Sequence, residues 1–129
     1  MSTRSLIGKL NPDHTVTYIY CHFDGYPSGV GNTLMKHYDS PILIDQLLAL
    51  GDLSVLGSTL GEKQDFSNYN SESGWCLAYG RDRGESNTEA KIASVEDYFE
   101  SSRHGEDFKY LYFENEWSAY DWKGNPISL

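Results

Sequence analysis

The stretch Tyr20–Gly31, with the sequence YCHFDGYPSGVG, limits the fold more than any other part of the chain. The residues before it, Thr15–Tyr20, are β-branched and aromatic, as is typical of a strand, and the Asp-Gly and Tyr-Pro pairs end that strand. Beyond the turn, Val30, Leu34 and Tyr38 recur every four residues and predict the buried face of a short helix. The sequence therefore predicts a strand, a glycine-bearing turn and a helix in direct succession.

Two hairpins are predicted, one near each end of the chain. The runs Ser5–Leu10 and Thr15–Phe23 flank a short polar link that contains a proline, which is typical of a β-hairpin. The aromatic, alternating runs Phe108–Phe113 and Glu116–Trp122 predict a second hairpin.

Helix signals lie between these hairpins. Ser40 and Pro41 precede an apolar run that Gly51 ends, which predicts a second helix with a serine N-cap. Ser94 followed by Asp97 resembles the capping box of a third, short helix. The remaining predictions are a long loop over 51–74, a strand over 75–79 and a charged turn over 80–85.

Together these elements predict an α+β fold. We expect a mostly antiparallel sheet of about five strands, with two or three short helices packed on one face. A chain of 129 residues is long enough to bury one core without disulfides, so residues 1–129 are expected to form a single compact domain.

The formal net charge is −9, and the acidic residues are concentrated in the last third of the chain. A surface of this sign repels nucleic acid and anionic membranes, and it attracts a basic protein surface. The alternative is that these charges only keep a small protein soluble. From Val95 onward the charged residues are Glu96, Asp97, Glu100, Glu106, Asp107, Glu114, Glu116 and Asp121, against Arg103, Lys109 and Lys123.

The compartment is predicted from what the sequence lacks. No apolar run reaches the roughly 20 residues that a membrane-spanning helix needs, and the first residues do not resemble a secretion signal. We therefore expect a soluble, cytoplasmic protein. Cys21 and Cys76 lack metal-type spacing, so two buried free thiols are favoured over a disulfide between them.

His22 and Asp24 are the first candidates for chemistry. In an extended segment they point the same way, so they could bind a metal or act as an acid–base pair. A third ligand is missing nearby, and His14, His37 and His104 are only distant candidates. The favoured alternative is structural, with Asp24 capping the turn and His22 hydrogen-bonded within it.

The glycine-bearing segment Gly25–Gly31 is a candidate anion site because free N–H groups before a helix can hold a phosphate. It matches neither of the two standard nucleotide-binding signatures, and a tight strand-to-helix turn is the alternative.

Arg81 and Arg83 could bind an anion together, because each guanidinium offers a planar fork of donors, and Arg4 could join them. Asp82 and Glu85 could instead neutralise this pair in surface ion pairs.

The motifs of the first half resemble a group of small, uncharacterised proteins of bacteriophages and prophages. The resemblance rests on the opening MSTRS, on the motif of Tyr20–Gly31, and on Leu34, His37-Tyr38 and Leu50-Gly51-Asp52. It covers roughly the first 60 residues and the range 78–85. It implies a phage-borne accessory protein in the bacterial cytoplasm, and such proteins often block host defences, but it assigns no activity to any residue.

The leading hypothesis is therefore a non-enzymatic acidic protein of phage origin that needs no cofactor or metal. It would inhibit a bacterial defence system, a CRISPR–Cas or restriction complex, by occupying a basic surface, as a monomer or as a homodimer. The predicted partner-binding residues are Glu96, Asp97, Glu100, Glu114, Glu116, Tyr110, Tyr112 and Trp117, with Tyr98 and Tyr120 as further aromatic anchors.

Two alternatives stay open. One is a small-molecule binder that sequesters a nucleotide immune signal. The other is a metal-assisted hydrolase built on His22 and Asp24. The small-molecule site would consist of Arg4, His22, Asp24, Tyr26, Arg81 and Arg83.

Overall fold

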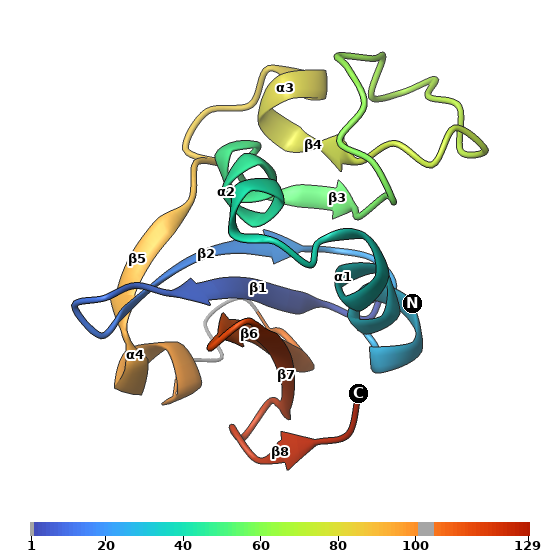
Figure 1. The fold of residues 1–129 in the computed structure, drawn as a ribbon. Coiled ribbons are helices and arrows are strands. Elements are labelled where there is room, and N and C mark those ends of the chain that lie inside the picture. Colours follow the sequence, from blue (N-terminus) through green and yellow to red (C-terminus); the bar gives the residue numbers. More distant parts are fainter. Residues whose placement is uncertain (1, 101–104) are drawn as a thin grey trace.

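The computed structural model describes residues 2–100 and 105–129, which form a mixed β-sheet with short helices around it (Figure 1). The strands are β1 (Ser5–Leu10), β2 (Thr15–Cys21), β3 (Leu53–Val55), β4 (Leu77–Ala78), β5 (Lys91–Ser94), β6 (Phe108–Phe113), β7 (Glu116–Asp121) and β8 (Pro126–Ile127). The helices are the π-helical turn η1 (Pro27–Gly31), α1 (Asn32–His37), α2 (Pro41–Ala49), α3 (Tyr79–Arg83) and α4 (Val95–Glu100).

The α+β class is confirmed, and most strand pairings are antiparallel, but the sheet formed by the described residues has 8 strands instead of about five. The strand order is β4-β3-β2-β1-β6-β7-β8, and β5 pairs with the first half of β2. Both predicted hairpins are present. The pairings β1–β6 and β2–β3 are parallel, with Ile7 opposite Tyr110 and Cys21 opposite Leu53. Two neighbouring parallel strands need a long connection between them. The parallel pair β1 and β6 has one, because the chain passes through β2 and all the elements up to α4 before it reaches β6.

Helices cover both faces of the sheet, which corrects the prediction that they pack on one face. On one face, Ile7 and Tyr110 belong to the same buried cluster as Leu34 of α1 and Leu47 of α2. On the opposite face, Tyr98 of α4 packs in a second buried cluster, with Leu6, Val16 and Leu111. Side chains alternate between the faces of a strand, so successive residues of β1 and β6 contribute to different cores. The sheet is therefore the middle layer of the molecule.

The predicted helix starts are confirmed in detail. The Leu43 N–H donates to Ser40 Oγ at 3.4 Å, and Pro41 begins α2. The Asp97 N–H donates to Ser94 Oγ at 3.1 Å, which caps α4. These side chains satisfy N–H groups that lack partners within their own helices.

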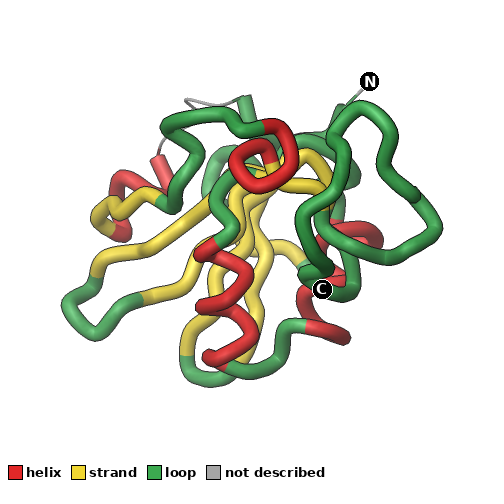
Figure 2. The backbone as a smooth tube through the Cα atoms, turned by 90° about the horizontal axis from the view of Figure 1, so that it is seen from above, coloured by secondary structure: helices red, strands yellow, loops and turns green. Residues whose placement is uncertain are grey.

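The β4 edge departs from the prediction. The expected strand over 75–79 is reduced to β4, and the expected charged turn over 80–85 begins as the helix α3, which ends with Gly84 in the left-handed region at a φ of 73°. The loop expected over 51–74 is confirmed only in part, because its first residues form the strand β3, while the chain between β3 and β4 runs as a long loop (Figure 2). Trp75 holds the end of this loop against Gly61, where a Cβ would lie 2.3 Å from the indole Cγ.

Cys21 and Cys76 are both buried and both free. Burial raises the pKa of the Cys21 thiol to about 12, so this side chain behaves as an apolar core residue.

Among the described residues, the helices are all too short or too polar to cross a membrane.

Candidate functional site

One end of the sheet collects turns that carry exposed carboxylates. β5 finishes there with Ser94 opposite Thr15, so α4 begins at this end. The parallel strands β1 and β6 reach it together, with Lys9 opposite Tyr112, so the β1–β2 and β6–β7 turns also lie there. Asp39, in the link after α1, adjoins Glu116 in a pocket. We define the acidic end as the exposed residues Asp13, Asp39, Glu96, Asp97, Glu114 and Glu116.

The acidic end keeps its negative charge facing solvent. In the part of the chain that the structure describes, none of its carboxylates takes part in an ion pair. Lys9, near the end of β1, already pairs with Asp45, with 2.8 Å between Nζ and Oδ1. Lys36 and His37 are exposed on the last turn of α1. Like charges held on neighbouring turns produce a local negative potential that a cationic surface would relieve.

The β6–β7 turn contains a strained glutamate. Glu114 and Asn115 have φ values of 51° and 65°. Two-residue hairpin turns with positive φ prefer Asn, Asp or Gly, and a residue of glutamate's size in this conformation costs about 1–2 kcal/mol. Glu114 therefore presents its carboxylate from a turn position that Asn, Asp or Gly would occupy with less strain.

A pocket of about 260 Å³ opens at the acidic end between α1 and the β6–β7 hairpin. The Trp117 indole is held in place, because its Nε1–H donates to the Tyr38 carbonyl at 2.8 Å. The rings of Tyr112 and Trp117 lie 5.3 Å apart at 59°. We call this cavity the Trp117 pocket; it is lined by Met35, Asp39, Tyr112, Asn115, Glu116 and Trp117.

Burial changes the role expected of the aromatic residues. Tyr98, Tyr110 and Tyr112 are only 2%, 0% and 5% exposed, so they are core residues and not surface anchors, although the small exposed part of Tyr112 lines the Trp117 pocket. Tyr120 is half-buried and packs edge-on against Phe99 of α4, with the ring centroids 4.6 Å apart. The alternating residues of β6 lie on both faces of the sheet, and both faces are buried, so the prediction of exposed anchors is wrong for Tyr98, Tyr110 and Tyr112.

The other acidic residues of the last third lie elsewhere. Glu106 is buried beside Lys109, with 3.8 Å between Oε1 and Nζ. Asp107 and Asp121 line an open groove at the opposite end of the sheet. Glu100 ends α4 and is exposed. Arg103 and His104 lie outside the described residues.

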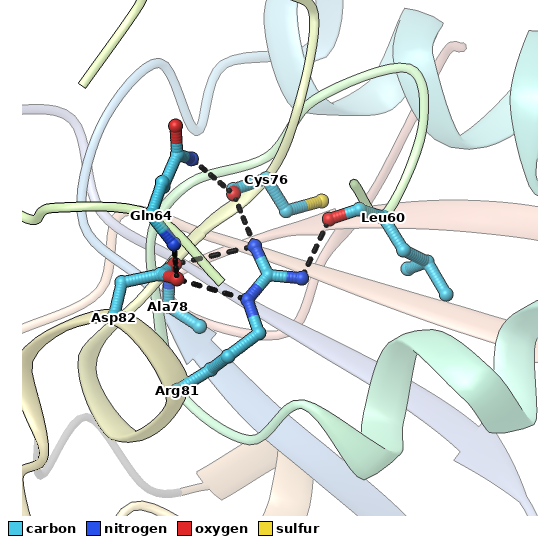
Figure 3. Close-up of polar contacts among 6 residues, drawn as sticks. All are labelled: Leu60, Gln64, Cys76, Ala78, Arg81 and Asp82. Carbon is cyan, nitrogen blue, oxygen red and sulfur yellow. Dashed lines mark hydrogen bonds and ion pairs between the residues drawn. The ribbon is translucent and has the colours of Figure 1, made fainter. Parts of the chain in front are cut away.

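Arg81 points inward and supports the loop between β3 and β4 (Figure 3). Its guanidinium donates to the carbonyls of Leu60 and Cys76, both at 2.7 Å, and pairs with Asp82 at 3.0 Å. The Asp82 carboxylate, fully buried, also accepts from the N–H groups of Ala78 and Gln64. Burial alone would raise the pKa of Asp82, but the hydrogen bonds from Arg81 and from these two N–H groups outweigh it and lower the pKa. Arg81 is therefore a structural residue.

Arg83 points outward instead. Its guanidinium lies 4.7 Å and 4.9 Å from the ring centroids of Phe66 and Tyr79, and it pairs with exposed Glu85. The two arginines thus do not form the anion-binding pair that the sequence suggested, although the predicted Arg83–Glu85 ion pair is present.

A second cluster lies at the other end of β2. The Tyr20 hydroxyl and His22 Nδ1 are 2.6 Å apart. Burial and then the charge of Arg4 lower the pKa of His22, while burial raises the pKa of Tyr20 against the opposing effect of Arg4. Tyr79 is close enough to raise the Tyr20 pKa further. We call Arg4, Tyr20, His22, Tyr79 and Arg83 the cationic–aromatic cluster.

His22 and Asp24 do not act on each other in this arrangement. Asp24 has a φ of 58° and accepts a hydrogen bond from the Tyr26 hydroxyl at 3.1 Å. The described residues contain no group of three or more His, Cys, Asp or Glu side chains that could hold a metal ion. The structural alternative, a capped turn, describes this segment better than a catalytic pair.

The N–H groups of the glycine turn are mostly occupied. Gly25 N donates to the Thr3 carbonyl at 2.8 Å, and Val30 N donates to the Asp24 carbonyl at 2.9 Å. These bonds fix the turn, so the same N–H groups are not available for a phosphate.

No protein-family model matches the chain, and no curated protein or solved structure matches it either. The function of the chain is therefore inferred from its geometry and charge and from the resemblance of its motifs to phage proteins.

Proposed function

We propose that the chain is a non-enzymatic binding protein whose acidic end docks on a basic surface of another protein. The observation that supports this most is that Glu96, Asp97, Glu114 and Glu116, which are distant in sequence, meet at one end of the sheet without ion pairs among the described residues. Concentrated charge speeds association and selects partners of the opposite sign.

The kind of partner is inferred from the negative charge of the acidic end and from the resemblance to phage proteins. A basic protein groove that normally holds nucleic acid presents the positive potential that the acidic end complements. The resemblance to phage proteins suggests a bacterial defence complex, of the CRISPR–Cas or restriction type, as the owner of such a groove. Occupying the groove would inhibit the complex without any turnover.

We expect the acidic end to be required for partner capture. The acidic-end variant carries Glu96→Gln, Asp97→Asn, Glu114→Asn and Glu116→Gln, which remove four negative charges with little change in size. Asn suits the strained turn position better than Glu, so this variant should fold at least as well there. Affinity capture from a phage-infected bacterial lysate, read by mass spectrometry, should retain a basic protein on the wild type and lose it on the variant.

The matched control removes the same charge elsewhere, with Glu62→Gln, Glu72→Gln, Glu85→Gln and Glu89→Gln, all at exposed positions. This control should retain the partner as the wild type does. Equal capture by all three proteins, or equal loss from both variants, would contradict docking through the acidic end.

A second candidate function is the capture of a nucleotide by the cationic–aromatic cluster. Two observations favour it: the Tyr20 hydroxyl lies 2.6 Å from His22 Nδ1, and the Arg83 guanidinium lies over the Tyr79 ring. The charge of Arg4 acts on the pKa values of both Tyr20 and His22. Aromatic rings can stack on a base while guanidinium groups bind phosphate.

For this second candidate, cyclic nucleotides or ADP-ribose-type nucleotides should raise the melting temperature of the wild type, and Arg83→Ala should remove the increase. Lys36→Ala is the control, since it removes a cation from α1, away from the cluster. Differential scanning fluorimetry measures this, and an increase that survives Arg83→Ala would argue against the cluster as the site.

A further inference from the structure

We infer that the Trp117 pocket receives the guanidinium group of an arginine from the partner protein. This inference rests on the proposed function, and it names the side chain that would anchor the docked partner. The pocket combines aromatic walls, Tyr112 and Trp117, with two carboxylates, Asp39 and Glu116.

The size of the pocket suits one side chain. Its volume of about 260 Å³ lies below the roughly 300–1,000 Å³ that is typical of sites for drug-sized ligands. Interface anchors are commonly single Arg or aromatic side chains that fill such pockets, and their surroundings exclude water.

The walls favour a planar cation. Aromatic faces attract cations through their negative π-surface, and a guanidinium can also stack flat against them. Trp117 is fixed by its hydrogen bond to the Tyr38 carbonyl, so this wall is formed before any partner arrives. Met35, which is 46% exposed, is a flexible side chain that can adjust to the inserted group.

The two carboxylates of the pocket favour a ligand that can donate hydrogen bonds in two directions. Asp39 follows α1, and Glu116 begins β7, so the two carboxylates approach the pocket from different elements. Both are exposed, and neither takes part in an ion pair among the described residues. The five N–H donors of a guanidinium can serve two carboxylates at once, whereas a lysine ammonium offers a compact charge without a stacking plane.

Among the residues that the structure describes, no cation of the chain lines the pocket. Lys36 and His37 lie on the last turn of α1 between Met35 and Asp39 in sequence, but the pocket is lined by Met35 and Asp39 and not by these two. The carboxylates are therefore available to an external cation.

Hexaarginine and hexalysine peptides, which carry the same charge, provide the test. Titrations are followed by ¹⁵N NMR, using the indole N–H of Trp117, assigned with Trp117→Phe, as the reporter. The indole of Trp122, which is 53% exposed and outside the pocket, is the internal control. We expect hexaarginine to shift the Trp117 signal and to bind about fivefold more tightly than hexalysine.

The variant Asp39→Asn with Glu116→Gln should weaken hexaarginine binding about tenfold and abolish the preference over hexalysine. A control variant with Glu96→Gln and Asp97→Asn should weaken both peptides equally and keep the preference. If both peptides bind the acidic end equally and the Trp117 signal does not move, the pocket inference is wrong while the proposed function stands. If no acidic-end substitution weakens the binding of either peptide, the proposed function is wrong as well.

Discussion

Replacing Arg81 with alanine is expected to lower the free energy of unfolding by about 3–5 kcal/mol. The substitution removes one hydrogen bond to each of the Leu60 and Cys76 carbonyls and leaves the Asp82 carboxylate buried without its cation. The Cys76 carbonyl keeps its second donor, Gln64 Nε2, at 3.1 Å. Breaking a buried pair on one side is costly because the remaining charge can neither be solvated nor be paired. The loss is a large share of the 5–15 kcal/mol that stabilises a typical domain.

Chemical denaturation followed by circular dichroism measures the free energy of unfolding of Arg81→Ala and of the wild type. A variant that is already unfolded in buffer would also agree with the predicted loss of stability. Arg83→Ala is the matched control, because its side chain is 49% exposed and its ion pair and its contacts with the Phe66 and Tyr79 rings lie at the surface, so it should cost only about 1–2 kcal/mol. Arg81→Lys should not restore stability, since one ammonium cannot replace the planar fork. Similar losses for Arg81→Ala and Arg83→Ala would show that Arg81 is not the internal support described above.

Replacing Tyr110 with alanine is expected to cost about 3–5 kcal/mol, as is typical of large aromatic residues in a core. The side chain is 0% exposed in β6, and its hydroxyl donates to the Gly25 carbonyl at 2.6 Å. Tyr110 thus connects the parallel β1–β6 pairing to the glycine turn. Tyr110→Phe keeps the ring but leaves that carbonyl without its donor, so it should cost about 1–3 kcal/mol.

The control for Tyr110 is Tyr69→Ala, because Tyr69 is 38% exposed in the long loop and should change stability little. Denaturation midpoints of the three variants give the comparison. If the Tyr110→Ala protein were as stable as the wild type but bound the partner more weakly, Tyr110 would be a surface anchor and not a core residue.

Local signals in the sequence were enough to place most elements. The hairpin β1–β2, the capped start of α2 and the Ser94 cap of α4 are each determined by residues within a few positions of one another. Such signals act through the backbone and through turn chemistry, which is why they can be found in a single sequence.

Long-range arrangements could not be found in this way. The parallel pairing of Ile7 with Tyr110 joins residues that are far apart in the chain, and nothing in either strand specifies the other. Arg81 and Arg83 lie two residues apart in sequence but face inward and outward, because the turn expected there is the helix α3.

The candidate site was predicted only in part. The acidic residues Glu96, Asp97, Glu114 and Glu116 were identified from composition, and the structure places them at one end of the sheet. Asp39 was not identified, because its contribution depends on where the link after α1 meets the β6–β7 turn. The sequence shows only an acidic residue just after a predicted helix, and this pattern is too common to identify a binding site.

The most direct test of the central claim is the dissociation constant of the captured partner for the wild type, the acidic-end variant and the matched control. Isothermal titration calorimetry at low and at physiological salt would give the three values. Docking through the acidic end predicts about 100-fold weaker binding for the acidic-end variant, with a reduced dependence on salt, and a control within about threefold of the wild type. Equal affinities for the wild type and the acidic-end variant would contradict it.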